Sequence, residues 1–390
     1  MICGRNRATK WLLTGVLAAL LAATATAEAS AATLKDLGTL PDGTISHAAA
    51  INDLGQVTGA AETTDGYFHP YRWTRSGGML DLGTLGGLGG SAFPRAINNL
   101  GQVAGDADTS RGGAFVHAFR WTPSGGMQDL GGLAGPLTWV HASAINDLGQ
   151  VVGQAETEVD SGPSHAYRWT PFGGMQDLGT LGGPESDAVA INDCGLIAGS
   201  ADTADGSFHA FRWTPFGMQD LGTLGGTTSV GVAINARGQV AGRAETADGS
   251  VHAFRWTPSG GMQDLGTLGG TESAAVAINP RGQVAGRAAT ADGSLHAFRW
   301  TPSGGMQDLG TLGGTESDAA AINERGQITG RAETADGSFH AFLWTPSGGM
   351  RDLGTLGGPA SGAVAINERG QIAGDAETAD GPDHAFLWTP

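Results

Sequence analysis

Eight of the chain's ten histidines occupy one position of a repeated motif, and their chemistry is the first question that the sequence raises. The motif reads His-Ala-Phe-Arg-Trp in its commonest form, as at residues 252–256. Histidine is a frequent metal ligand and general base, so eight copies could form metal sites or a repeated catalytic device. The other interpretation is that the motif belongs to the packing.

Strand geometry favours the packing role. On a β-strand, His252, Phe254 and Trp256 point the same way, because side chains alternate between the two faces. In a ring of eight equivalent copies, neighbouring histidines would lie about 10 Å apart, too far to share a metal ion at bond lengths of about 2.1 Å. We therefore predict that the aromatic residues fill the space between copies and that the histidine ties its strand to a neighbouring polar group. This structural role is assigned to His252, Phe254, Trp256, His296 and Trp300.

Acidic residues recur in a turn of nearly every copy, as in Glu245/Asp248 and Glu333/Asp336. Paired acids can hydrolyse glycosides, but catalysis needs one distinct pair rather than a repeated one. Calcium needs about six oxygen ligands, more than these turns supply. No nucleophile motif or phosphate-binding loop is present. We assign no catalytic residue, metal ligand or cofactor, and calcium is the only cation kept as a candidate.

The first 31 residues have the pattern of a secretory signal peptide. Arg5, Arg7 and Lys10 precede an apolar run at residues 11–23, and small residues suited to cleavage follow. We predict export to the cell exterior or the periplasm, with no membrane span elsewhere. Cys3 would leave with the leader, so Cys194 is expected to have no intramolecular partner.

The formal net charge is −17, and the leader carries three bases against one acid, so its removal makes the chain more acidic still. This charge argues against nucleic acids and anionic membrane surfaces as partners.

Residues 32–390 form a single domain of eight repeats. Asp-Leu-Gly, Ile-Asn and Trp each recur eight times at intervals of 43–48 residues, a length typical of a four-stranded propeller blade. One copy shows expected strands at residues 274–279, 283–290, 295–301 and 306–312, with Asp292-Gly293 forming a hairpin turn.

The two ends of the repeat region favour a closed ring. Residues 34–38 supply a lone fourth strand at the start, and the last copy ends without one. The prediction is an all-β, eight-bladed β-propeller of antiparallel blades, closed by the N-terminal strand. A β-solenoid is the alternative.

Insertions occur in only two of the connections, and only in the first three copies; the one other length change is a residue fewer between Trp213 and Asp220. In a meander blade these two connections emerge on the same face, and loops on a rigid scaffold commonly carry binding residues. Neutral drift of early copies is the competing explanation. The candidate ligand-binding residues are Trp139, His141, Phe93, Arg95, His47, Arg111, Glu158 and Asp160.

The combined motif resembles the bacterial HAF-repeat family of extracellular repeat proteins. The similarity rests on His-Ala-Phe-x-Trp-Thr-Pro, Gly-Gly-Met-x-Asp-Leu-Gly-Thr-Leu-Gly-Gly and Ala-Ile-Asn-x-x-Gly-Gln-Val-x-Gly, and it covers about residues 34–390. It departs from the pattern at Pro70, Tyr71 and Tyr167. The resemblance implies secretion and a repeat fold, and it carries no established activity or functional residues.

The sequence therefore favours a secreted, monomeric binding module for an extracellular carbohydrate or protein over an enzyme. The alternatives are an extracellular polysaccharide hydrolase or lyase, and a purely structural matrix protein.

Overall fold

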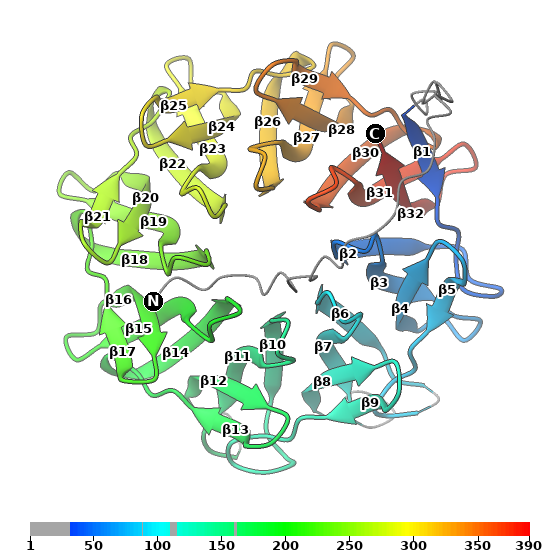
Figure 1. The fold of residues 1–390 in the computed structure, drawn as a ribbon, viewed down its shortest axis with the longest axis horizontal. Helices are drawn as coiled ribbons and strands as arrows, with labels where there is room; N and C mark the ends of the chain where they lie inside the picture. The colour runs from blue at the N-terminus through cyan, green and yellow to red at the C-terminus, as the bar shows by residue number, and fades with distance from the viewer. Residues whose placement is uncertain (1–31, 88, 110–114, 160–161) are drawn as a thin grey trace, which may run out of the picture.

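The computed structural model describes residues 32–87, 89–109, 115–159 and 162–390. These residues form eight four-stranded antiparallel sheets, arranged as blades around a central channel, and they contain no helix (Figure 1). The predicted all-β, eight-bladed β-propeller is confirmed. The leader assigned to residues 1–31 lies outside the described residues.

Each blade is a meander, and we call its strands A to D from the channel outward and the blades I to VIII in chain order. Blade I is β2 (Ser46–Ile51), β3 (Val57–Glu62), β4 (Phe68–Thr74) and β5 (Gly78–Asp81), and blade II is β6 (Ala92–Ile97), β7 (Val103–Asp108), β8 (Val116–Thr122) and β9 (Gly126–Asp129). Blade III is β10 (Val140–Ile145), β11 (Val151–Glu156), β12 (Ser164–Thr170) and β13 (Gly174–Asp177), and blade IV is β14 (Gly182–Ile191), β15 (Ile197–Thr203), β16 (Phe208–Thr214) and β17 (Gly217–Asp220).

The remaining blades follow the same order. Blade V is β18 (Gly225–Ile234), β19 (Val240–Thr246), β20 (Val251–Thr257) and β21 (Gly261–Asp264), and blade VI is β22 (Gly269–Ile278), β23 (Val284–Thr290), β24 (Leu295–Thr301) and β25 (Gly305–Asp308). Blade VII is β26 (Gly313–Ile322), β27 (Ile328–Thr334), β28 (Phe339–Thr345) and β29 (Gly349–Asp352), and blade VIII is β30 (Gly357–Ile366), β31 (Ile372–Thr378), β32 (Asp383–Thr389) and β1 (Thr33–Asp36).

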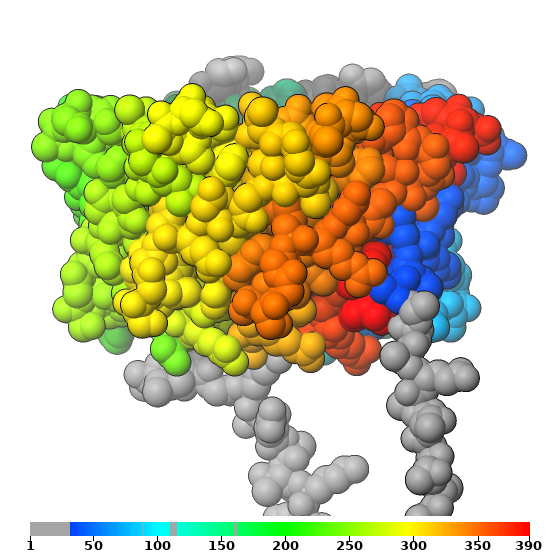
Figure 2. Space-filling view, turned by 90° about the horizontal axis from the view of Figure 1, so that it is seen from above, coloured from blue at the N-terminus to red at the C-terminus, as the bar shows by residue number. Residues whose placement is uncertain are grey.

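The two ends of the described chain close the ring together. Strand β1 pairs antiparallel with β32, in a register that places Lys35 opposite Leu387. Figures 1 and 2 show the blue first strand against the red last blade. The prediction that the N-terminal strand completes blade VIII is confirmed.

Two strand boundaries differ from the predicted ones by more than one residue. Strand A of blade VI begins at Gly269 rather than at residue 274, because the Gly-Gly connector is already part of the sheet. Leu268 beside it forms a parallel bridge with Thr290. Strand D ends at Asp308 rather than at residue 312. In blades I to III the longer D–A loops replace this extension, so their strand A has six residues instead of ten.

The hydrophobic core lies between the blades rather than within them. Phe254 and Trp256 of blade V are buried against Ala198, Ala210 and Leu221, which belong to blade IV and to the connection that follows it. Burying one such aromatic side chain stabilises the fold by roughly 1.5–3 kcal/mol. Clusters of this kind occupy the other seven junctions as well, so each repeat is stabilised by its neighbours.

A cation from one blade also lies over the motif tryptophan of the next. The guanidinium of Arg212 is 4.9 Å from the ring centroid of Trp256, and a strand C arginine makes the equivalent contact at five other junctions. Blades VII and VIII have Leu343 and Leu387 at that position of strand C. There the cation comes from the directly opposite residue of strand D, which is Arg351 or Lys35.

The A–B turns form a continuous hydrogen-bonded belt around the channel. In blade VI, the side chain of Asn279 accepts from the backbone N–H groups of Arg281 and Gln283. Its Nδ2 donates to the backbone carbonyl of Asn323 in blade VII, 3.0 Å away. The turn ends in Gly282 at φ 76°, where other residues are strained. The belt asparagines are Asn52, Asn98, Asn146, Asn192, Asn235, Asn279, Asn323 and Asn367, and each bonds to the next.

Cys194, in the A–B turn of blade IV, is disulfide-bonded. The expectation that it has no intramolecular partner applies to the chain after removal of the leader, and it stays a prediction. The chain's other cysteine, Cys3, lies outside the described residues.

Candidate functional site

The D–A and B–C connections lie on one face of the ring, which we call the insertion face, and the A–B and C–D turns lie on the other, the turn face. Of the eight candidate residues, Arg111 and Asp160 lie outside the described residues. Glu158 is exposed in its loop and lines neither of the cavities described below. The other five lie on strand A of blades I to III or directly before it.

A cavity of about 470 Å³ lies between the inner strands of blades I and II. His47 of β2 and Phe93 of β6 line it, together with Phe68 from strand C of blade I. The three rings form a row, with centroids 6.3 Å apart for His47 and Phe68 and 6.0 Å apart for Phe68 and Phe93. This wall offers flat apolar surface to a ligand, as expected of a concave binding site.

A second cavity, of about 440 Å³, adjoins the first and shares Arg95 with it. Here Arg95 forms an ion pair with Asp106, at 3.0 Å between Nη2 and Oδ2. The same carboxylate lies 3.6 Å from Nδ1 of His141 in blade III and accepts a hydrogen bond from the backbone N–H of Ala142. Asp106 is nearly buried, whereas Arg95 is exposed, so the guanidinium is held by its partner but remains open to a ligand.

Trp139 completes the group from the loop before β10. Its ring centroid lies 6.2 Å from that of His141, and its backbone N–H donates to Glu156. The side chain is 41% exposed. An exposed indole beside a polar cavity can stack on a sugar ring or an aromatic side chain.

Nearby carboxylates set the charge of the two strand A histidines. Contact with Asp106 raises the pKa of His141, and contact with Asp375 raises the pKa of His47, in both cases against the opposing effect of burial. Burial raises the pKa of Asp187, which occupies the position in β14 equivalent to His141. Within the described part of the chain, its Oδ1 is buried and makes no hydrogen bond. The site therefore combines cationic, anionic and aromatic groups.

Sequence reasoning missed Phe68, Asp106, Asp187 and Asp375. The last three lie on strands A and B, which have the same length in most copies, whereas loop length was the signal used. Aligning the copies residue by residue would have found them. The strand B position opposite His47 of strand A and its equivalents holds Ala60, Asp106, Gln154, Ser200, Arg243, Arg287, Arg331 and Asp375.

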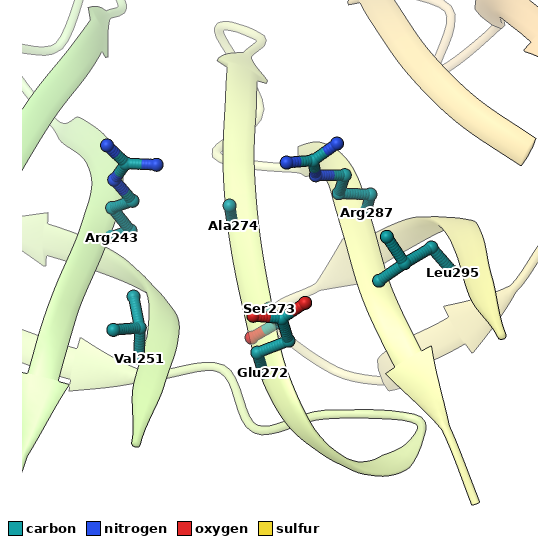
Figure 3. Close-up of a pocket in the computed structure, with 7 residues that line it drawn as sticks. All are labelled: Arg243, Val251, Glu272, Ser273, Ala274, Arg287 and Leu295. Atoms are coloured by element: carbon teal, nitrogen blue, oxygen red, sulfur yellow. The ribbon is translucent and has the colours of Figure 1, made fainter. Parts of the chain in front are cut away.

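The regular blades build a different surface at these positions. In Figure 3, Arg243 and Arg287 lie on either side of the strand that carries Ala274, with the carboxylate of Glu272 below them. The cavity there is only about 60 Å³. The cavities of about 470 and 440 Å³ lie instead along strand A of the blades that carry insertions.

Each motif histidine contacts a carboxylate of the adjacent strand. His252 Nδ1 lies 2.9 Å from Asp264, and the seven other copies repeat the contact at 2.9–3.1 Å. The same aspartate also accepts from the glycine N–H two residues later. In the described ranges, no group of three His, Cys, Asp or Glu side chains could hold a metal ion. Calcium binding remains a prediction.

Five of the belt asparagines, and the residue that follows each of the eight, line the channel, which encloses about 670 Å³ at this level. Across the described residues, no helix is long and apolar enough to cross a membrane.

No family model matches the chain, and no curated protein matches it either. The similarity to the HAF-repeat family thus remains a prediction.

Solved structures that share the fold include one from a study of two prolyl endopeptidases, with a TM-score of 0.57 and 10% identity over 90% of this chain and 54% of that one. The β-propeller domain of the Trilobed protease from Pyrococcus furiosus gives 0.51 and 10%, over 81% and 100%. A Mycobacterium tuberculosis puromycin-hydrolyzing peptidase gives 0.51 and 13%, over 85% and 57%. At these identities the comparisons establish a β-propeller and nothing about activity.

Proposed function

We propose that this chain is an exported binding protein that holds an extracellular carbohydrate or peptide at the insertion face of blades I to III. One observation supports this most directly. Four residues that depart from the repeat, His47, Phe93, Arg95 and His141, line two adjoining cavities, and a fifth, Trp139, lies beside His141. Each cavity falls within the range of about 300–1,000 Å³ that small-ligand sites occupy. Export rests on the signal-peptide pattern and on the resemblance to the HAF-repeat family.

The site's chemistry suits a polar ligand with a flat face. The row of His47, Phe68 and Phe93 can stack on a sugar or a peptide side chain, while Arg95 and Asp106 can donate to and accept from its polar groups. Among the residues that the structure describes, the strand A positions equivalent to His47 and Phe93 carry no aromatic side chain in blades IV to VIII. Random drift would give no reason for the divergent residues to line the same cavities.

A glycan and peptide array, probed with the mature protein, tests the proposal. We expect Arg95→Ala to weaken binding of any hit at least about tenfold, because a charged hydrogen bond contributes about 1.5–3 kcal/mol. Alanine occurs naturally at the equivalent Ala49, so the variant should fold. Val276→Ala, at the equivalent position of blade VI, is the matched control and should bind like the wild type. Equal binding by all three proteins to every hit would refute the site.

Asp187 favours a second candidate, a polysaccharide hydrolase or lyase. Burial raises its pKa, whereas Asp106 forms an ion pair with Arg95. Two carboxylates in such different environments can divide the roles of acid and base. Release of reducing or unsaturated ends from polysaccharides by the wild type, and its loss in Asp187→Asn, would support the enzyme over the binding module.

A further inference from the structure

The turn face carries apolar side chains that the repeat does not require. Phe172 and Phe216 occupy the C–D turns of blades III and IV, and both are fully exposed, at 104% and 101%. Neither side chain contributes to a core cluster. Five other blades have a serine at this position: Ser76, Ser124, Ser259, Ser303 and Ser347.

A second set of exposed apolar side chains lies on the same face, at the tips of the A–B turns; we call the exposed residues of these turns the tips. Leu54, Leu100 and Leu148 of blades I to III are 56–61% exposed. The equivalent residues of blades V to VIII are also exposed, and they are Arg237, Arg281, Arg325 and Arg369. Apolar side chains therefore gather over blades I to IV, and basic tips over blades V to VIII.

The strand C arginines add positive charge to this face. Arg72 and Arg255 each reach the carbonyl of the A–B turn glycine in the next blade, at 3.5 and 3.4 Å. The acids of the turn face follow the belt asparagines and line the channel mouth, and they are Asp53, Asp147, Asp193, Glu324 and Glu368. The acidic B–C turns, such as that of Asp248, lie on the opposite face. Although the whole chain has a negative net charge, its turn face is rich in cations.

The belt gives these tips a rigid and nearly level arrangement. Because every A–B turn is bonded to the next through its asparagine, the eight turns lie at the same height around the channel. A ring of level tips meets a flat partner with many of them at once. Aromatic and aliphatic side chains next to arginines suit the boundary between lipid headgroups and acyl chains, where the cations pair with lipid phosphates.

We propose that the turn face docks reversibly on the surface of a lipid bilayer that contains anionic lipids. Phe172, Phe216 and Leu148 would enter the headgroup boundary, while Arg237 and Arg281 pair with phosphates beside them. The insertion face, with its cavities, then points away from the membrane and stays open to ligand.

Flotation with phosphatidylcholine vesicles, with and without phosphatidylglycerol, tests this docking. We expect the wild type to float with the phosphatidylglycerol vesicles and to bind less at high salt, because exposed charges are screened. The double variant F172S/F216S should lose at least about tenfold of its partitioning, since burying one phenylalanine side chain contributes roughly 1.5–3 kcal/mol. Serine is the residue that other blades carry there, so the variant should keep the wild-type thermal unfolding.

Leu137→Ser is the matched control, because Leu137 is an exposed apolar residue on the insertion face. It should float like the wild type, and R237S/R281S should lose binding to anionic vesicles. Absence of flotation at both lipid compositions would overturn the proposal, as would equal flotation of F172S/F216S and the wild type. Self-association that F172S/F216S abolishes, without vesicle binding, would assign the face to a second copy of the chain instead.

Discussion

The side-chain amide of Asn367 donates to the backbone carbonyl of Asn52 across 3.0 Å, and this contact joins residues that are 315 positions apart. It is the last link of the asparagine belt, and it lies at the inner edge of the junction that β1 closes at the outer edge. The ring is therefore closed by contacts at both its inner and its outer edge. Each blade contacts only its neighbours, so the eight-repeat ring depends on contacts that join its first and last blades.

Removing one belt donor should destabilise the whole ring. In Asn279→Asp, the remaining carboxylate oxygen can still accept from the turn, but the donors to Asn323 and to Gln283 are lost. We expect a loss of about 1–3 kcal/mol, because a buried carbonyl is left without its donor. Urea unfolding measures the loss. Arg281→Ala, an exposed change in the same turn, is the control and should stay within about 0.5 kcal/mol of the wild type.

Much of the fold could be predicted from the sequence because the same pattern of strands and turns occurs in eight copies. The Trp256 and Asp-Leu-Gly spacing gives the blade length, and Leu34 to Gly38 reveal the displaced fourth strand. The asparagine belt was visible only as an invariant turn, because its bonds join different copies. The blade junctions could not be derived from one copy alone.

The site was predictable only in part, for a physical reason. Inserted loops revealed Trp139, His141 and Phe93, since extra length is visible in a sequence. Asp106 changes no length, and its contact with Arg95 depends on the register between β6 and β7. Asp375 reaches His47 across the closure of the ring, a contact that exists only after folding.

Arg351 and Leu343 should behave as an exchangeable pair. Arg351→Gln removes the cation from Trp388, and we expect it to cost about 0.5–1 kcal/mol. Adding Leu343→Arg recreates the arginine and glutamine arrangement of blade V, where Arg255 faces Gln263, and should restore most of the loss. A double-mutant cycle by chemical unfolding measures the coupling. If the two changes are simply additive, the cation–ring contact contributes nothing to stability.

The His69–Asp81 pair should make stability depend on pH. Contact with Asp81 raises the pKa of His69 in the folded protein, so the contribution of this histidine is complete below about pH 6.5 and disappears as the pH rises through the raised value. The pKa of Asp81 is lowered: burial opposes this, but the contacts with His69 and the Gly83 N–H outweigh it. Its contribution is present above the ordinary aspartate pKa and is lost on acidification.

His69→Gln should therefore lower the melting temperature more near about pH 5.5 than near about pH 8.5. Scanning calorimetry of wild type and variant at both pH values checks this. Val276→Ala serves as a control whose effect should not vary with pH. A wild-type advantage that grows as the pH rises would contradict the assigned direction of the pKa shift.

Asp106 should control the protonation of His141. In Asp106→Asn, the amide oxygen can still accept from the backbone N–H of Ala142, but the negative charge beside the imidazole is lost. We expect the pKa of His141 to fall toward its ordinary value of about 6.5, because the carboxylate contact is what raises it. Proton NMR titration of the histidine resonances, with His141→Gln to assign the signal, measures the change. His47 is held by Asp375 in another junction and should titrate as in the wild type, whereas an unchanged His141 would show that Asp106 does not set its charge.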